Sequence, residues 1–380
     1  MNIAQISTRF YPAIGGVERT TWETSKRLAL KGNLVFALTS NVDNVKPRTF
    51  LPLGQSVLEQ VHVVRFRNLL PNFLDSSGQF GFIMPSLTAF LKNLSKQLDV
   101  VHSHGYSFFP SYGLLPILKS RKFKWIITGS ASFDSRFPRQ IYDYTIGRAI
   151  IKYSDKIICQ NQLEKKIFMK WGKKDEDTPL IPAGVYFPIN HNTSPSSKIK
   201  LIIDQGKFIL FVGRIAKNKG LDLLVQAFSH ITKSYVDLKL VICGPDGGEL
   251  SLISNLIAKL KMESKIIITG PVTDSDLHWL YTNSLIFVAP SLYGEAQNMA
   301  ATQALKYGKP VIVSDSGGMP DFYKNVEGTI ISRAGSLNSL KESLIYALSN
   351  LDSIKVFEKK KVIYTWDEVV ELTVKAYKDS

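Results

Sequence analysis

A short helix between two apolar strands constrains the fold more than any other feature of this sequence. Residues 285–289 and 311–313 are apolar runs typical of buried parallel strands, and a small-residue helix, Asn298–Leu305, lies between them. Such a unit closes with a right-handed crossover, and ligands bind beyond the carboxyl ends of its strands. Glu295 follows the first strand and Gly317-Gly318 the second, so the pattern predicts a site that includes Glu295.

A glycine pair, Gly15-Gly16, separates a predicted strand at Ile3–Ile6 from a predicted helix at Val17–Lys31. Glycines at this place let backbone N–H groups approach an anion, and the helix N-terminus adds a favourable partial charge. The pair is also ordinary turn chemistry, so it predicts an anion site only through its position after the first strand.

Two histidines, His102 and His104, follow a predicted strand that ends in Val100-Val101. Their spacing of two residues does not fit a helical zinc pair, and no third ligand cluster accompanies them, so we expect no metal site. His102 is equally well interpreted as a hydrogen-bonded core residue.

Two basic residues, Arg214 and Lys219, lie between a predicted strand at Phe208–Val212 and a helix that ends near Thr232. A planar guanidinium and an ammonium in one strand-to-helix loop supply two cations for one anion. The solubility of a loop also explains two basic residues, which is the alternative interpretation.

The length and charge of the chain predict its organisation. A sequence of 380 residues favours two domains, because one core seldom serves so long a chain. Residues 1–200 hold 27 Lys and Arg against 13 Asp and Glu, whereas residues 201–380 hold 20 against 19. A basic surface attracts nucleic acid, anionic membranes or acidic substrates, and it is equally well an ordinary solvated surface. The basic half contains no nucleic-acid recognition module, so we expect no nucleic-acid partner.

The sequence predicts a cytoplasmic protein. Met1–Ser7 lack the pattern of a signal peptide, and no run of about 18 apolar residues predicts a membrane-spanning helix. Cys159 and Cys243 lie in apolar runs, which predicts two buried free thiols. The apolar segment 73–91, flanked by basic sequence, suggests peripheral attachment to an anionic membrane at its inner face; burial in its own domain is the alternative.

Taken together, these segments resemble the family 4 retaining glycosyltransferases, which have the GT-B fold. The family's donor segment has Pro-Ser, an acid, a Gly/Phe-rich loop, a second acid eight positions later, and Ala-x-Ala-x-Gly-x-Pro-Val. Here Glu295 is the first acid, Gln303 stands in place of the second, and Ala296-Gln297-Asn298 replace Gly-Phe-Gly. Residues 213–220 resemble the family's Gly-Arg-x-x-x-x-Lys-Gly motif.

The resemblance implies an α/β protein of two Rossmann-like domains whose parallel sheets face each other across a cleft. We expect an acceptor-side domain at 1–188 completed by a C-terminal helix at 362–380, and a nucleotide-sugar-binding domain at 201–361. A linker is predicted at 189–200, where Asn, Ser, Thr and Pro are frequent.

The resemblance also assigns roles to particular residues. Glu295 and His104 are expected at the transferred sugar as catalytic residues, and Gln303 at the nucleoside ribose. Gly15 is expected on the acceptor side. The donor diphosphate is expected to contact Gly16, Arg214, Lys219, Asn298 and Met299.

The function implied is transfer of a sugar, with retention, from a UDP- or GDP-sugar to a glycan or lipid-linked acceptor. Preorganised cations and N–H donors stabilise the departing diphosphate, so we expect no metal and no other cofactor. An Asp-x-Asp at Asp274–Asp276 looks like the metal motif of other glycosyltransferases, but its position before a helix favours capping. The alternatives are a non-catalytic nucleotide-sugar-binding subunit, favoured by Gln303, and a sugar-nucleotide epimerase of the same architecture.

Overall fold

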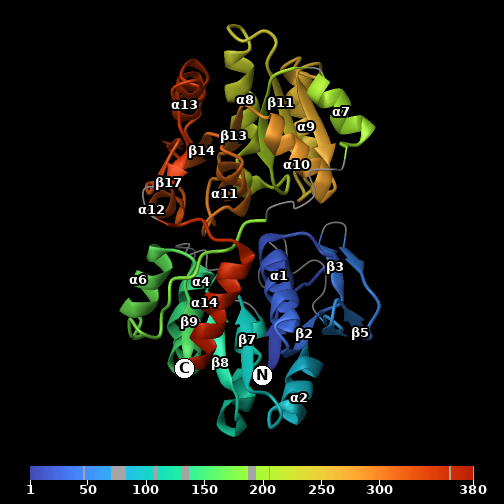
Figure 1. Ribbon diagram of the computed structural model, residues 1–380, viewed down its shortest axis with the longest axis vertical. Coiled ribbons are helices and arrows are strands. Elements are labelled where there is room, and N and C mark those ends of the chain that lie inside the picture. The colour runs from blue at the N-terminus through green and yellow to red at the C-terminus, as the bar shows by residue number, and fades with distance from the viewer. Residues whose placement is uncertain are drawn as a thin grey trace. The chain divides into compact units, whose positions relative to one another are not determined.

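The computed structural model describes residues 1–45, 48–69, 83–106, 109–129, 137–186, 194–204, 206–358 and 361–379. The chain forms two compact units: Met1–Gly184 together with Trp366–Ser380, and Val185–Thr365 (Figure 1). The chain therefore passes between the units twice, after Gly184 and before Trp366.

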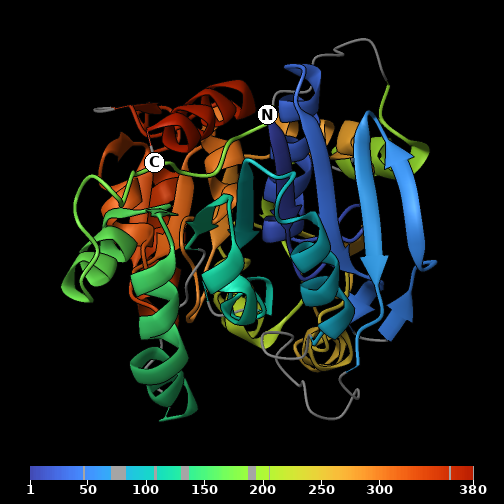
Figure 2. The ribbon, with the colours of Figure 1, turned by 90° about the horizontal axis from the view of Figure 1, so that it is seen from below.

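The first unit is built on a seven-stranded sheet in the order β5-β6-β2-β1-β7-β8-β9. Its strands are parallel except for β5, which pairs antiparallel with β6 at one edge (Figure 2). In chain order the strands are β1 (Asn2–Ile6), β2 (Leu34–Ser40), β5 (Gly54–Leu58), β6 (Val61–Phe66), β7 (Val100–His104), β8 (Lys124–Thr128) and β9 (Lys156–Ile158). A separate hairpin joins β3 (Val42–Val45) to β4 (Arg48–Phe50).

Helices cover the sheet of the first unit, and the last helix of the chain is one of them. Helix α14 packs beside α1, where Arg27 Nε donates to Asp367 Oδ1 at 3.0 Å (Figure 1). The helices are α1 (Gly16–Leu30), α2 (Pro85–Leu94), α3 (Phe109–Tyr112), the 3-10 helix η2 (Leu115–Ser120), α4 (Phe137–Tyr142), the π-helical turn η3 (Asp143–Gly147), α5 (Arg148–Tyr153), α6 (Gln162–Lys170) and α14 (Trp366–Lys378).

Helices α4 and α5 are joined by the π-helical turn η3, so the chain is helical throughout this stretch. Of the apolar segment 73–91, residues 73–82 lie outside the described residues. The remainder enters helix α2, whose Leu87 and Leu91 are buried in the core of the unit.

The second unit is built on a fully parallel six-stranded sheet in the order β12-β11-β10-β13-β14-β16. The strands are nearly all apolar because both faces are buried, each against its own core cluster. They are β10 (Phe208–Val212), β11 (Lys239–Cys243), β12 (Ile266–Gly270), β13 (Ile286–Ala289), β14 (Val311–Ser314) and β16 (Thr329–Ser332); β15 (Val326–Glu327) pairs separately with β17 (Phe357–Glu358).

Helices lie on both faces of this second sheet (Figure 1). Residues 197–200 of the predicted linker belong to the first of them, because Ile199 and Ile202 bury their side chains in the core. The helices are α7 (Ser197–Asp204), the 3-10 helix η4 (Lys217–Lys219), α8 (Leu221–Ile231), α9 (Leu250–Lys259), α10 (Asp274–Asn283), α11 (Met299–Lys306), α12 (Met319–Tyr323) and α13 (Leu337–Ser349).

The predicted fold class is confirmed: each unit is a Rossmann-like α/β domain built on a parallel sheet. Cys159 and Cys243 are buried free thiols, as predicted. Within the described ranges, no helix combines the length and the apolar character needed to cross a bilayer.

Candidate active site

Each sheet has one point where the order of its strands reverses. In the first unit the chain places β2 on one side of β1 and β7 on the other; in the second it places β11 and β13 on opposite sides of β10. Such switch points open a crevice beyond the carboxyl ends of the strands, where ligands of α/β proteins bind. The predicted site residues follow these central strands: β1 and β7 in the first unit, β10 and β13 in the second.

An ion pair occupies the switch point of the second unit. Glu295 Oε1 accepts a hydrogen bond from Ser291 Oγ at 2.9 Å and forms a salt bridge with Lys219 Nζ. The side chains of Lys219 and Glu295 are only 18% and 9% exposed. The loops after β10 and β13 thus bring together two predicted residues 76 positions apart. Ser291 completes the group and was not predicted.

Two glycines let neighbouring loops approach this ion pair closely. Gly220 has φ +64°, and a Cβ there would lie 2.2 Å from the carbonyl oxygen of Pro290. Gly317 has φ +60°, and its Cβ would lie 2.2 Å from the carbonyl oxygen of Glu295. A side chain at either position would therefore force apart the loops that hold Lys219 and Glu295.

A second cation stands in the same loop as Lys219 without a partner of its own. Arg214 is exposed, and within the described parts of the chain its guanidinium makes no ion pair or hydrogen bond. Its loop is nevertheless fixed, because Ile215 N donates to Pro245 O at 2.9 Å and Ile215 forms a bridge with Asp246. A held backbone with an unpaired cation suits the binding of an anion.

The N-terminus of helix α11 follows Glu295 in the chain. Asn298 caps it: its Oδ1 accepts from Ala301 N at 3.1 Å, and its carbonyl accepts from Tyr323 Oη at 2.9 Å. Its φ is +62°, a left-handed conformation that Asn adopts more readily than other residues with a side chain. Met299 is the first helical residue, so the partial positive charge of the helix lies at these two positions.

Gln303 lies one turn farther along α11, and its amide is hydrogen-bonded to the backbone. Oε1 accepts from Tyr186 N at 2.9 Å, and Nε2 donates to Tyr186 O. The ribose-binding role expected for Gln303 stays a prediction.

In the first unit, His102 and His104 belong to a buried polar network. Their rings stack 4.3 Å apart and are 2% and 1% exposed. His102 bonds to Tyr377 Oη at 2.6 Å and to Thr128 Oγ1 at 2.8 Å, and His104 Nε2 to Gln5 Oε1 at 2.7 Å. Burial lowers the pKa of His104 to about 3. The pKa of His102 is held well below its usual value, mainly by burial and to a smaller extent by the neighbouring His104. Both rings are therefore neutral.

One ring nitrogen in this network has no partner. His104 Nδ1 is buried and makes no hydrogen bond within the described part of the protein. The residue His104 helps to line a cavity of about 20 Å³, together with residues of α1, β7, β8, β9 and α14, Gln160 and the segment 181–183. A volume of that size is enough for a single water molecule.

The glycine pair begins helix α1. Gly15 precedes the helix with φ 170°, and Gly16 is its first residue. A Cβ at Gly15 would lie 2.1 Å from Glu18 Oε2, so the absence of a side chain makes room for that carboxylate. Glu18 forms a salt bridge with Arg9 of the preceding loop. Neither residue was predicted, because a single acid and a single base carry no motif.

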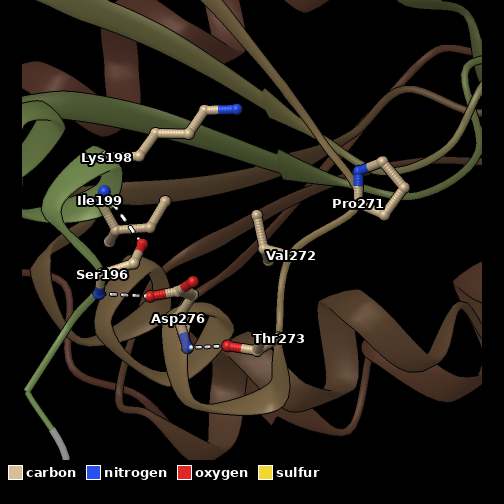
Figure 3. Close-up of a pocket in the computed structure, with 7 residues that line it drawn as sticks. All are labelled: Ser196, Lys198, Ile199, Pro271, Val272, Thr273 and Asp276. Atoms are coloured by element: carbon tan, nitrogen blue, oxygen red, sulfur yellow. Dashed lines mark hydrogen bonds between the residues drawn. The ribbon is translucent and has the colours of Figure 1, made fainter.

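The Asp-x-Asp segment begins helix α10, beside a pocket of about 290 Å³ (Figure 3). Capping by its carboxylates is wrong: Thr273 caps α10, and its Oγ1 accepts from Asp276 N at 3.1 Å. Asp276 Oδ1 accepts instead from Ser196 N at 2.8 Å (Figure 3). No group of three His, Cys, Asp or Glu side chains within the described ranges is placed to hold a metal ion.

Comparison with protein families accounts for both units. Residues 14–186 match the model of glycosyltransferase family 4, and residues 193–361 match the model of glycosyl transferases group 1. The chain belongs to glycosyltransferase family 4. The predicted family is therefore confirmed.

Named relatives and solved structures are similar to this chain over nearly its whole length. One human phosphatidylinositol N-acetylglucosaminyltransferase subunit is 24% identical over 99% of this chain and 75% of its own length. Sucrose-phosphate synthase from Thermosynechococcus elongatus superimposes with a TM-score of 0.78 at 19% identity, covering 99% of this chain and 98% of its own. Anabaena HepE, solved with UDP and glucose, gives a TM-score of 0.75 at 15% identity with full coverage of both chains. These structures share the GT-B fold.

One departure of this chain from the family motif, at Asn298, has a structural explanation. Asn298 stands where the family pattern has the last glycine of Gly-Phe-Gly. The structure needs a left-handed backbone there, which glycine adopts freely and asparagine tolerates. Asparagine therefore preserves the turn and adds a helix cap through its side chain.

Proposed function

We propose that this glycosyltransferase transfers a sugar, with retention, from a nucleotide-diphosphate sugar to a glycan or lipid-linked acceptor at a membrane surface. UDP-sugars are the first candidates for the donor, because HepE binds UDP and UDP-glucose. A lipid-linked acceptor is favoured by the relatives named as phosphatidylinositol N-acetylglucosaminyltransferase subunits. The observation that carries the proposal is the Lys219–Glu295 pair together with the unpaired Arg214.

The leaving diphosphate gains negative charge as the glycosidic bond breaks. We assign Arg214, Lys219 and the N-terminus of α11 at Asn298 and Met299 to stabilising that charge, together with the backbone of Gly16 in the first unit. Lys219 is paired with Glu295 in the structure, so an incoming diphosphate competes with this carboxylate for the ammonium. These groups supply the positive charge, and the proposed route requires no metal ion or other cofactor.

Glu295 is assigned to the transferred sugar. When Lys219 turns to the diphosphate, the carboxylate is left to accept hydrogen bonds from sugar hydroxyls and to favour the positive charge that develops on the ring. His104 is assigned to the same sugar by the family motif, and Gly15 to the acceptor side. Since His104 Nε2 is bonded to Gln5, we assign the ligand contact of this ring to Nδ1.

A thermal-shift panel of UDP, GDP, ADP and CMP, each alone and as a sugar conjugate, tests the donor. A nucleotide at a hundred times its Kd stabilises the protein by about 2.7 kcal/mol, and we expect this with one diphosphate. Arg214→Ala removes a charged hydrogen-bond donor and weakens that Kd by about tenfold or more, whereas Lys217→Ala, an exposed lysine of the same loop, does not.

The other outcomes of the panel are equally informative. A shift that Arg214→Ala leaves unchanged would remove this residue from the site. Binding without turnover of the conjugate would favour the non-catalytic subunit, and a changed donor sugar without an acceptor would favour the epimerase. Failure to float with liposomes of any anionic lipid content would contradict the membrane surface as the place of action.

A further inference from the structure

The amide of Gln303 and the peptide group of Tyr186 are matched donor to acceptor. Tyr186 N donates to Oε1 at 2.9 Å, while Nε2 donates to Tyr186 O. The two residues are 117 positions apart, and both side chains are partly buried. This is the pattern by which neighbouring strands pair, with a side-chain amide in place of one peptide group.

We propose that Gln303 is a positioning residue that fixes the start of the second unit to helix α11. A carboxylate at this position accepts from Tyr186 N but has no hydrogen to donate, and it faces the carbonyl oxygen of Tyr186 with a like charge. An amide satisfies both backbone groups. The substitution of glutamine for the family's glutamate is thereby explained by the pairing with Tyr186 and not by ribose recognition.

The paired peptide lies where the chain enters the second unit. Val185 N, one residue earlier, donates to Tyr364 O at 2.8 Å, and Val185 forms a bridge with Thr365. The residues that begin and end the second unit are therefore joined to each other, and Gln303 joins them to α11. Since α11 begins at Asn298 and Met299, one short helix connects both chain passages to the proposed diphosphate site. Only this last connection rests on the proposed function.

Two variants separate the pairing from a ribose contact. Gln303→Leu removes both hydrogen bonds, and Gln303→Glu keeps the acceptor but loses the donor. Two hydrogen bonds of ordinary strength correspond to about tenfold in an opening equilibrium. Exchange of the Tyr186 amide hydrogen, measured by NMR on the whole protein, is expected to become about tenfold faster in Gln303→Leu at neutral pH. In Gln303→Glu, which keeps the acceptor for this amide, we expect faster exchange by a smaller factor. Gln226→Leu and Gln226→Glu are the controls, because this amide bonds within its own helix α8.

Lowering the pH is expected to reverse the defect of Gln303→Glu. Protonation turns the introduced carboxylate into a group that donates to Tyr186 O and accepts from Tyr186 N, which restores both hydrogen bonds. The nearby carbonyl oxygen raises the folded-state pKa of the introduced group, so the defect is largest above that pKa and fades as the pH falls. Gln303→Leu shows no such recovery.

Binding of UDP, measured by calorimetry, completes the test. If Gln303 is a positioning residue, the Kd of Gln303→Leu for UDP should stay within about threefold of the Kd of the unsubstituted protein. In donor turnover by this variant, kcat should fall by a larger factor than KM rises. A Kd weakened tenfold with unchanged Tyr186 exchange would overturn the proposal in favour of ribose recognition. Tyr186 exchange that is unaffected in both variants would overturn it as well. If UDP does not bind at all, the proposed donor is wrong, but the exchange measurement still decides the role of Gln303.

Discussion

The two switch points have the same topology and opposite chemistry. In the first unit, Gln5, His102, His104 and Tyr377 are buried, neutral and bonded to one another. In the second unit, Lys219 and Glu295 are charged, and Arg214 of the same loop is exposed. A buried neutral network stabilises the fold and, among the described residues, leaves only His104 Nδ1 of its two rings without a partner, whereas charged side chains at a crevice are available to a ligand. One strand order therefore serves both purposes, depending on which side chains follow the central strands.

The largest expected effect lies at the charged switch point. Glu295→Gln keeps the shape of the side chain but removes its charge, so we expect kcat for transfer or donor hydrolysis to fall on the order of 100-fold. The Kd for UDP should stay the same or become tighter, because Lys219 loses its competing partner. Glu263→Gln, at an exposed carboxylate, is the control. Unchanged turnover would remove Glu295 from the mechanism.

A smaller effect is expected at the neutral switch point, and on stability instead of turnover. Tyr377→Phe removes a hydroxyl that accepts from Gln5 Nε2 at 2.8 Å and bonds to His102 Nδ1 at 2.6 Å. Two buried polar groups lose a partner, which costs about 1–3 kcal/mol for each group. Urea unfolding, monitored by hydrogen exchange in residues 1–184, measures the loss in the free energy of unfolding. Tyr346→Phe, at a side chain in a helix of the second unit that is 57% exposed, should cost less than about 0.5 kcal/mol. Equal stabilities would show that the network contributes nothing.

The smallest effect is a dependence on pH confined to the first unit. The pKa of His104 is about 3 in the folded protein against 6.5 for an unperturbed histidine, so the unfolded chain binds the extra proton. The stability that the neutral His104 contributes to the folded protein is therefore fully present above the pKa of histidine in the unfolded chain. It is lost as the pH falls toward the pKa of His104 in the folded protein. Between about pH 7.5 and about pH 5.5 we expect a loss of about 1 kcal/mol per buried histidine. Unfolding of the first unit at the two pH values measures it. His104→Gln should reduce the loss and His230→Gln, at an exposed ring, should not; an equal effect of both would contradict the neutral network.

Local patterns in the sequence predicted the elements that hold the second unit's site. The strand at Phe208–Val212 was predicted from its apolar run with the bounds that the structure gives β10. The resemblance placed Lys219 at the donor diphosphate and Glu295 at the transferred sugar, but it did not predict the ion pair that joins them. The residues of the charged switch point were predictable because they lie in recognisable loops, whereas their mutual contact was not.

The other contacts that the sequence could not predict are long-range and uncharged. Tyr377 reaches His102 across 275 positions, and Gln303 reaches Tyr186 across 117. Nothing in the local pattern of a tyrosine or a glutamine indicates such a partner.

The contribution of α14 to the first unit has a consequence for the newborn chain. Ribosomes deliver Met1–Gly184 first, then all of Val185–Thr365, and only afterwards the helix that buries Trp366, Val370 and Tyr377 against the first unit. Domains fold as units once their parts are present. The first unit, although translated first, can therefore be completed only after the second unit has been synthesised. Until then, the apolar surface that α14 covers stays exposed.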